Sequence, residues 1–325
     1  MPRIIRSIGL TATVAVAALA VTSLAVAPAQ ASEPVPESIF ESADAPALSV
    51  LTHNVMMLPP ITGSFDNGTR ARLIAESDYV RGHDVVVFEE AFDNGPSDRL
   101  KSGLAAQYPY QTPVMGRSKS GWDQTLGDYS WATPEDGGVT VLSKWPITRK
   151  VQYVYDDACG ADWFSNKGFV YVRLDVDGSP VHVVGTHGQA EDTGCVDAES
   201  VRASQFGELD AFLDGLAIPS TEPVVVTGDL NVIRESPEYA QMLATLDVVE
   251  PAYAGPRYTF DPATNSMTST RYPGHAPEHL DYVLYRTGNQ GAPWTNTTIT
   301  PVAPPSSFGG VTHNDYADHY PVVAR

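Results

Sequence analysis

The sequence predicts an α/β (α+β) fold in which mixed β-sheets pack on one another in the middle and helices cover the outside. Two observations predict it. Short runs rich in valine and aromatic residues recur along the chain, and longer segments with helical spacing of apolar residues fall between them. Runs such as Pro223-Val224-Val225-Val226-Thr227 are apolar on both alternating faces, which is typical of a strand covered on both sides. Many functions are compatible with such a layered core.

The predicted strands cover residues 48–55, 84–88, 138–143, 169–176, 181–185, 224–227 and 280–285. The short Asp177–Pro180 segment between the fourth and fifth predicts a hairpin. Helices are predicted over 69–81 and 197–215, and a third begins at Ser236, because Ser236 is a good N-cap and Pro237 suits the first helical position.

The first 31 residues have the pattern of an export signal. Arg3 and Arg6 supply a positive start, residues 7–27 are mostly small and apolar, and Ala29-Gln30-Ala31 fits a cleavage site. An uncleaved anchor is the alternative. No later stretch approaches the ~20 apolar residues of a spanning helix, so a secreted, extracellular protein is expected.

Residues 32–47 are rich in Pro, Ala, Ser and Glu and are expected to form a flexible leader. Residues 48–325 contain no internal repeat and no Gly/Ser linker, so a single domain is expected. The chain has 20 basic and 39 acidic side chains, a formal charge of -19. So acidic a surface disfavours binding to a nucleic-acid backbone. Only two cysteines occur, Cys159 and Cys195, and in an exported chain such a pair is more often a disulfide than two free thiols.

Polar clusters follow several of the predicted strands. Gly228-Asp229-Leu230-Asn231 follows one, Gly185-Thr186-His187 another, and Asp318-His319 lies near the C-terminus. Two histidines, two aspartates and an asparagine gathered at strand ends are suited to metal-assisted phosphoester hydrolysis, whereas each residue alone is explained equally well as a satisfied loop group. Asp229 and Asn231 are two residues apart, so they point to the same side of an extended segment.

The histidines can supply the proton chemistry, because an unperturbed imidazole titrates near pH 6.5. Asp318 is adjacent to His319, but neighbours on an extended strand face opposite ways. The partner of His319 is therefore Asp281 or Asp229, and spacing does not decide between them. Glu89-Glu90 and Asn54 end two other strand runs, where carboxylate and amide oxygens can bind a divalent cation, although solvated strand-end residues are the common case.

Taken together, these motifs resemble the secreted bacterial neutral sphingomyelinases of the endonuclease, exonuclease and phosphatase superfamily, from about residue 48 to the C-terminus. The motifs are Thr52–Val55, Glu90–Asn94, Pro134–Gly138, Ser143–Ile147, Gly185–His187, Gly228–Asn231, His279–Tyr282 and Asp315–Pro321. Gly-Asp-x-Asn and Asp-His mark only the superfamily, whereas Phe-Asp-Asn, Pro-Glu-Asp-Gly-Gly and Gln-Ala-Glu-Asp with the two cysteines indicate the branch. The resemblance implies a deoxyribonuclease-like, four-layer α/β/β/α sandwich.

The resemblance also implies roles. Glu90, Asn54 and His319 would form the central site for Mg2+, or else Mn2+ or Co2+, and His319 would also be the general base. The resemblance implies that Asp229 and Asn231 organise water and phosphate, that His187 stabilises the phosphoryl group, and that Asp281 orients its neighbours, with Asp318 in the same set. A second site at the sheet edge, for Mg2+ or Ca2+, would use Asn94, Glu135 and Asp136.

The implied reaction is hydrolysis of sphingomyelin, in membranes or micelles, to ceramide and phosphocholine. The sequence does not reveal the oligomeric state, and a monomer is the default expectation. The chain departs from the family at the hairpin near the C-terminus. There the family carries an exposed aromatic pair that enters lipid, but only Phe308 remains in Pro304–Gly310. Weaker membrane insertion through Phe308 is therefore expected, with an ordinary loop aromatic as the alternative. A nuclease or other phosphodiesterase of the superfamily, and a catalytically silent binding protein, are the competing hypotheses.

Overall fold

The computed structural model describes residues 48–325 apart from 64, 292 and 293, and these residues build two seven-stranded mixed sheets. In strand order, the first sheet contains β11 (Ala252–Ala254), β13 (Thr295–Thr298), β16 (Val322–Ala324), β1 (Val50–Asn54), β2 (Val85–Glu89), β5 (Thr140–Ser143) and β3 (Tyr110–Gln111). The second contains β10 (Val248–Val249), β12 (Asp281–Arg286), β9 (Val224–Asp229), β8 (Ser179–His187), β7 (Gly168–Val176), β6 (Ile147–Val154) and β4 (Gln124–Gly127).

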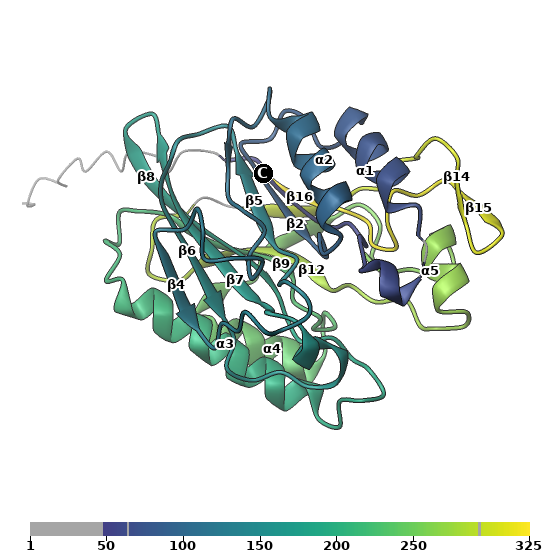
Figure 1. Cartoon of the computed structure of the whole chain (residues 1–325). Coiled ribbons are helices and arrows are strands. Elements are labelled where there is room, and N and C mark those ends of the chain that lie inside the picture. The colour runs from purple at the N-terminus through teal and green to yellow at the C-terminus, as the bar shows by residue number, and fades with distance from the viewer. Residues whose placement is uncertain (1–47, 64, 292–293) are drawn as a thin grey trace, which may run out of the picture. The chain divides into compact units, whose positions relative to one another are not determined.

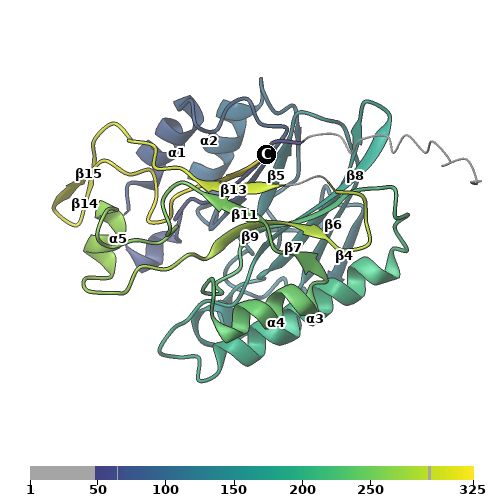
Figure 2. The ribbon, with the colours of Figure 1, turned by 180° about the vertical axis from the view of Figure 1, so that it is seen from behind.

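Helices cover the outer face of each sheet, as Figures 1 and 2 show from opposite sides. Helices α1 (Asn67–Glu76) and α2 (Asn94–Leu104) lie over the first sheet, and α3 (Ala198–Gly215) and α4 (Pro237–Thr245) lie over the second. A short helix α5 (Ser266–Arg271) and the hairpin of β14 (Ser306–Phe308) and β15 (Val311–His313) project from one end (Figure 1). The 3-10 turns are η1 (Pro60–Thr62) and η2 (Gly160–Phe164).

Three apolar clusters fill the interfaces between these four layers. Val87, Val141 and Val183 belong to the cluster between the sheets. Leu51, Phe88 and Leu100 are in the cluster under α1 and α2, and Phe206, Leu209 and Tyr282 are in the one under α3 and α4. Burying one such side chain fully is worth about 1.5–3 kcal/mol. The α/β/β/α sandwich expected from the sequence is thereby confirmed.

The predicted strand runs all form strands, and the hairpin is confirmed. Val176 of β7 pairs with Ser179 of β8, leaving Asp177 and Gly178 as a two-residue turn with φ of 52° and 88°. Such positive angles suit the Asp-Gly pair, because glycine has no Cβ to clash. The predicted third helix begins at Pro237 with the Ser236 hydroxyl accepting the Tyr239 amide hydrogen, also as expected.

One predicted helix was inaccurate, and several elements were not predicted, α2 and strand β6 among them. The helix predicted over 69–81 ends at Glu76, because Ser77 is extended and its hydroxyl donates to the Ile74 carbonyl. Helix α2 was not predicted, since its Asn94-Gly95-Pro96-Ser97 start is typical of a turn.

The signal segment 1–31 and the leader 32–47 lie outside the described residues. Within the described part, no helix is long and apolar enough to cross a membrane.

Candidate functional site

The candidate site lies where strands of both sheets end together. In the first sheet β1 ends at Asn54 and β2 at Glu89, and these two residues pair in the parallel register. In the second sheet β8 ends at His187 beside Asp229, the last residue of β9. Asp281 opens β12 antiparallel to β9 and pairs with the same Asp229. The register of five strands therefore gathers these side chains at one end of the sandwich.

His319 reaches this site from the segment that precedes β16. Its Nδ1 donates to Asp281 Oδ2 at 2.9 Å, and its Nε2 lies 3.7 Å from Asp229 Oδ2. Burial disfavours the protonated ring, but the charges of Asp281 and Asp229 outweigh burial and raise the pKa of His319 well above its usual value. The structure thus assigns Asp281 as the hydrogen-bonded partner that spacing left open.

Asp318 points elsewhere. Its Oδ2 forms an ion pair with Arg271 Nη1 at 2.6 Å, and its backbone carbonyl accepts from the Thr268 hydroxyl. It still lines the same cavity as His319. Asp318 therefore contributes charge to the wall of the site without contacting the imidazole through a hydrogen bond.

Asp229 is held at the centre by two amides. Its Oδ2 accepts from Asn54 Nδ2 at 3.0 Å, and its Oδ1 accepts from the Asn231 backbone at 3.0 Å. Burial raises the pKa of Asp229 to about 7, although His319 opposes this. The Asn231 side chain donates to the Gly188 carbonyl at 3.1 Å, and Asn231 takes a left-handed φ of 53°, a conformation that asparagine tolerates.

His187 faces Asp229 with an Nε2 to Oδ2 distance of 3.6 Å. Its Nδ1 is buried and has no partner among the described residues. Burial, with the nearby charges of Lys167 and His319, holds the pKa of His187 well below its usual value. A neutral imidazole at this position can donate a hydrogen bond without being a proton acceptor at neutral pH.

The two adjacent glutamates differ in position, and neither is simply solvated. Glu89 is fully buried between the sheets and accepts from the Thr52 hydroxyl at 2.6 Å. Glu90 takes a left-handed φ of 54° and lines the cavity with His319. Its Oε2 is buried and has no hydrogen-bond partner in the described part of the chain.

Two sets of oxygen and nitrogen atoms fit a divalent cation here. Glu90 offers the unpaired buried carboxylate oxygen, which is costly to leave without a partner. Asp229, Asp281 and His319 offer ligand atoms that all lie within 4.8 Å of one another. Hard cations such as Mg2+ prefer carboxylate oxygens, so the residues present are compatible with such a metal.

The residues proposed for the edge metal site are less available to a cation than those of the central site. Asp136 Oδ2 forms an ion pair with Arg117 Nε at 3.2 Å, and Oδ1 accepts from the Gly138 amide at 2.9 Å. Asn94 is exposed and Glu135 is half-buried. A cation at this edge would compete with Arg117 for Asp136, so the edge site stays a prediction.

The cavity at the site has a volume of about 180 Å³, and several residues that line it were not expected from the sequence. Phe260 and Tyr272 face each other edge to face at 5.3 Å, and the Phe260 ring lies 5.2 Å from that of His319. Glu278 also lines the cavity. These residues come from segments without a periodic pattern, so the sequence did not point to them. Only Glu278 had a signal, because it lies three residues before Asp281.

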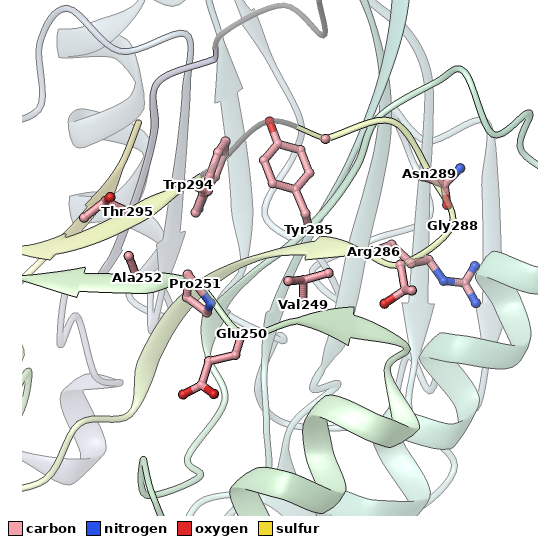
Figure 3. A pocket seen from close by; sticks show the side chains of 12 residues that line it. Val249, Glu250, Pro251, Ala252, Tyr285, Arg286, Gly288, Asn289, Trp294 and Thr295 are labelled. Atoms are coloured by element: carbon pink, nitrogen blue, oxygen red, sulfur yellow. The ribbon is translucent and has the colours of Figure 1, made fainter.

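A larger cavity of about 530 Å³ lies at the opposite end of β12, lined by Tyr285, Arg286 and Trp294 among others (Figure 3). Asp281 and Arg286 mark the two ends of that one strand. The guanidinium of Arg286 is already paired with Asp210 and Asp214. A larger cavity volume alone therefore does not make this cavity the functional site.

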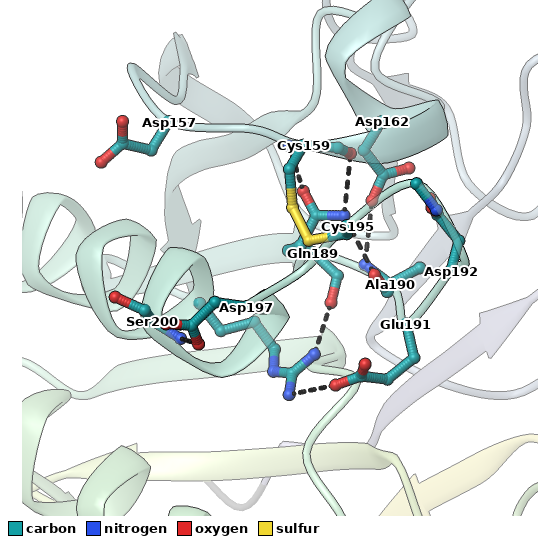
Figure 4. Close-up of a disulfide and its surroundings, with 12 residues drawn as sticks. Asp157, Cys159, Asp162, Gln189, Ala190, Glu191, Asp192, Cys195, Asp197 and Ser200 are labelled. Atoms are coloured by element: carbon teal, nitrogen blue, oxygen red, sulfur yellow. Dashed lines mark hydrogen bonds and ion pairs between the residues drawn. A yellow bond between two sulfur atoms is a disulfide. The ribbon is translucent and has the colours of Figure 1, made fainter.

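Cys159 and Cys195 form a disulfide that joins two loops beside the site (Figure 4). Gln189 and Ala190, which follow His187, are bonded to the same region: Gln189 Oε1 accepts from the Cys159 amide, and the Ala190 amide donates to Asp162. The bridge closes 36 residues, which by the loop-entropy model is worth roughly 3–4 kcal/mol. It holds the loop that lines the cavity.

Phe308 does not face solvent, which corrects its predicted role in contacting lipid. Its side chain is only 7% exposed, stacks on His313 at 4.0 Å and meets Phe65 edge to face at 5.5 Å. The hairpin tip between β14 and β15 consists of Gly309 and Gly310. The aromatic ring is thus a core residue of a small satellite cluster.

Comparison with known proteins identifies the family that this geometry belongs to. The sequence matches the Endonuclease/Exonuclease/phosphatase family over residues 51–319. The chain belongs to that family. Among curated relatives, sphingomyelinase C of Bacillus cereus is 43% identical over 85% of this chain and 88% of its own length, and phospholipase C of Staphylococcus aureus is 44% identical over 85% and 86%.

The chain spans about half the length of two further relatives. Sphingomyelinase C 2 of Leptospira interrogans is 43% identical over 85% of this chain but only 45% of its own length. Among solved structures, sphingomyelinase C from Streptomyces griseocarneus superposes with a TM-score of 0.84 at 50% identity, covering 86% of this chain and 99% of that one. A beta toxin mutant from Staphylococcus aureus with bound magnesium ions has a TM-score of 0.84 at 43% identity, covering 86% and 99%.

Proposed function

We propose that the protein is a secreted, metal-dependent phosphodiesterase that hydrolyses sphingomyelin to ceramide and phosphocholine. The observation that carries this proposal is the His319 imidazole, hydrogen-bonded at 2.9 Å to Asp281, in one cavity with the unpaired carboxylate oxygen of Glu90. The names of the relatives, sphingomyelinase C and phospholipase C, support the choice of substrate.

His319 is the proposed base. The neutral form of the ring is the one that acts: with its Nδ1 proton donated to Asp281, it takes a proton from the attacking water at Nε2, and the raised pKa makes this neutral form a stronger base. Asp281 keeps the ring in this tautomer and stabilises the imidazolium that forms. A divalent cation held by Glu90, with Asn54 nearby and Mg2+ as the proposed ion, would neutralise the phosphate oxygens and lower the barrier to attack.

His187 and Asn231 are proposed to bind the phosphoryl oxygens. The low pKa of His187 keeps its ring neutral, and a neutral ring can donate to an oxygen as negative charge develops. The Asn231 amide, already fixed by Gly188, has a second hydrogen to donate. Asp229 is proposed to hold Asn54 and Asn231 in place from its central position.

The wall beside His319 favours a choline head group. A quaternary ammonium has no N–H to donate, so it is recognised by aromatic rings and by a carboxylate that needs no hydrogen bond. Phe260 and Tyr272 supply the rings. Glu278 lines the cavity, and among the described residues its carboxylate has no hydrogen bond or ion pair. Burial raises the pKa of Glu278, which disfavours its charged form, and a cation beside the carboxylate would stabilise that form.

Phosphocholine release from sphingomyelin by the mature protein tests this function. We expect release that stops with a chelator and returns with Mg2+, and we expect His319→Ala to lose about 10²- to 10⁴-fold while keeping its unfolding midpoint. Tyr110→Ser, which changes an exposed side chain at the opposite end of the sheet, is the matched control with full activity. Cleavage of plasmid DNA without phosphocholine release would support another phosphodiesterase of the family instead.

A further inference from the structure

The three most exposed aromatic side chains among the described residues lie on a loop and on the adjoining 3-10 turn η2. Trp131 is 89% exposed, Trp163 66% and Phe164 55%, and we call these three residues the aromatic rim. The rings of Trp163 and Phe164 contact each other edge to face at 5.2 Å. Exposing large aromatic surface to water is unfavourable, so such a group marks a contact surface.

Hydrogen bonds join the two segments of the aromatic rim. The Ser130 amide donates to Asn166 Oδ1, and Asn166 Nδ2 donates back to the Ser130 carbonyl. Farther along, the Glu135 amide donates to the Phe164 carbonyl at 3.2 Å. The loop that carries Trp131 is therefore attached at both ends to the segment that follows Trp163.

The aromatic rim is also fixed to the wall of the catalytic cavity. Asp162, the residue before Trp163, accepts from the Ala190 amide at 2.9 Å and from Lys167 Nζ at 2.7 Å. Lys167 also donates to the Gly188 carbonyl at 2.8 Å. Figure 4 shows Asp162 and Ala190 side by side near the Cys159–Cys195 disulfide. Ala190 lines the cavity that contains His319, so Asp162 connects the aromatic rim to the loop that lines that cavity.

We propose that the aromatic rim is the surface that inserts into the head-group layer of a zwitterionic lipid membrane. The inference rests on the proposed function, because sphingomyelin presents its scissile bond at the membrane surface and the cavity must be brought to it. Tryptophan and phenylalanine favour this depth, where the ring body is apolar and the indole N–H remains hydrated. With Phe308 buried and glycines at the hairpin tip, the hairpin between β14 and β15 does not supply such a ring.

The negative charge of the chain favours contact with zwitterionic lipid over anionic lipid. The formal charge is -19, and Asp128, Asp156 and Asp157 lie on the loops around Trp163 and Phe164. Anionic lipid repels such a surface, whereas neutral, zwitterionic lipid leaves the aromatic contact to act alone. We therefore expect binding that persists in high salt and does not increase when phosphatidylserine is added.

The test is co-sedimentation of the full mature protein with vesicles of sphingomyelin and cholesterol, in the presence of a chelator so that turnover is stopped. The double variant Trp163→Ser/Phe164→Ser is expected to partition about tenfold less strongly than the unchanged protein. Tyr110→Ser, an exposed aromatic at the remote end of the first sheet, is the control and should bind like the unchanged protein. Trp163→Phe alone, with Phe164 unchanged, should bind almost as well as the unchanged protein, because an aromatic ring remains at position 163.

A second measurement separates lipid contact from catalysis. With short-chain sphingomyelin kept below its micelle concentration, the double variant should keep kcat/KM within about twofold, while its rate on vesicles falls about tenfold. Equal sedimentation of the double variant and the unchanged protein would overturn the inference, as would an equal loss on the monomeric substrate. If no substrate is cleaved by any variant, the proposed function fails, and the sedimentation difference still decides the lipid contact.

Discussion

At the scale of single residues, the partner of His319 determines how it works. Asp281 and Asp229 approach the two ring nitrogens at 2.9 and 3.7 Å, and both are almost completely buried. In so poorly solvated a site their charges act strongly on the proton affinity of the ring. The adjacent Asp318, the nearest acid in the sequence, is occupied by Arg271 instead.

Asp281→Asn is expected to lower kcat for phosphocholine release by about 10²- to 10⁴-fold. The amide removes the negative charge that stabilises the imidazolium, so the pKa of His319 falls and the acidic limb of the rate profile moves to lower pH. Asp318→Asn is the comparison, because Asp318 acts on His319 through its charge alone, without a hydrogen bond, and should move that limb less. A rate profile with an unmoved acidic limb in Asp281→Asn would contradict the assigned pairing.

At the scale of secondary-structure elements, Arg70 of α1 joins segments that carry the site. Its guanidinium is 1% exposed and donates to the carbonyls of Val55 and Tyr316 at 2.7 and 2.9 Å, as well as to the Met56 carbonyl. One side chain thus holds the segment after Asn54 against the segment before His319. Such carbonyls are costly to leave unpaired in the interior.

Arg70→Leu should lower the free energy of unfolding by about 3 kcal/mol or more, because several buried carbonyls lose their donor. Arg72→Leu on the same helix is the matched control: Arg72 is exposed and, among the described residues, its one ion pair is with Glu76 at i+4, so about 0.5 kcal/mol or less is expected. Urea unfolding measures both. Similar losses for the two variants would refute the role given to Arg70.

At the scale of the whole molecule, buried neutral histidines make stability depend on pH. Burial lowers the pKa of His53 to about 4, and its ring accepts from the Tyr79 hydroxyl at Nδ1 while Nε2 donates to the His319 carbonyl. The unfolded chain binds the proton near pH 6.5, the folded chain only near 4. This contribution to stability is therefore complete above pH 6.5 and is lost as pH falls toward 4.

His53→Gln should remove this dependence. Between pH 4.5 and 6 the free energy of unfolding of the unchanged protein should fall by about 1.4 kcal/mol more per pH unit than that of the variant. Urea unfolding at several pH values in chelator measures the two slopes. Parallel slopes would show that His53 titrates alike in both states.

Much of the fold could be predicted from sequence because its signals are local. Valine-rich runs such as 224–227 specify strands that are buried on both faces, and Ser236 with Pro237 specifies the start of a helix. Helix α2 escaped prediction because its start of Asn94, Gly95 and Pro96 has turn propensity, and contacts with α1 and the first sheet override it.

For the site, the sequence by itself determined which chemical groups are available: His187 and Asp229 stand at the ends of valine-rich strands, and His319 lies near the C-terminus. Only the tertiary structure decided that Asp281 is bonded to His319, that Phe308 is buried and that Glu278 lies in the cavity. The physical reason is the distance along the sequence over which each feature is determined. Strand ends are set by neighbours in sequence, whereas contacts between residues 38 apart, as Asp281 and His319 are, depend on the register between sheets and on the loops packed over them.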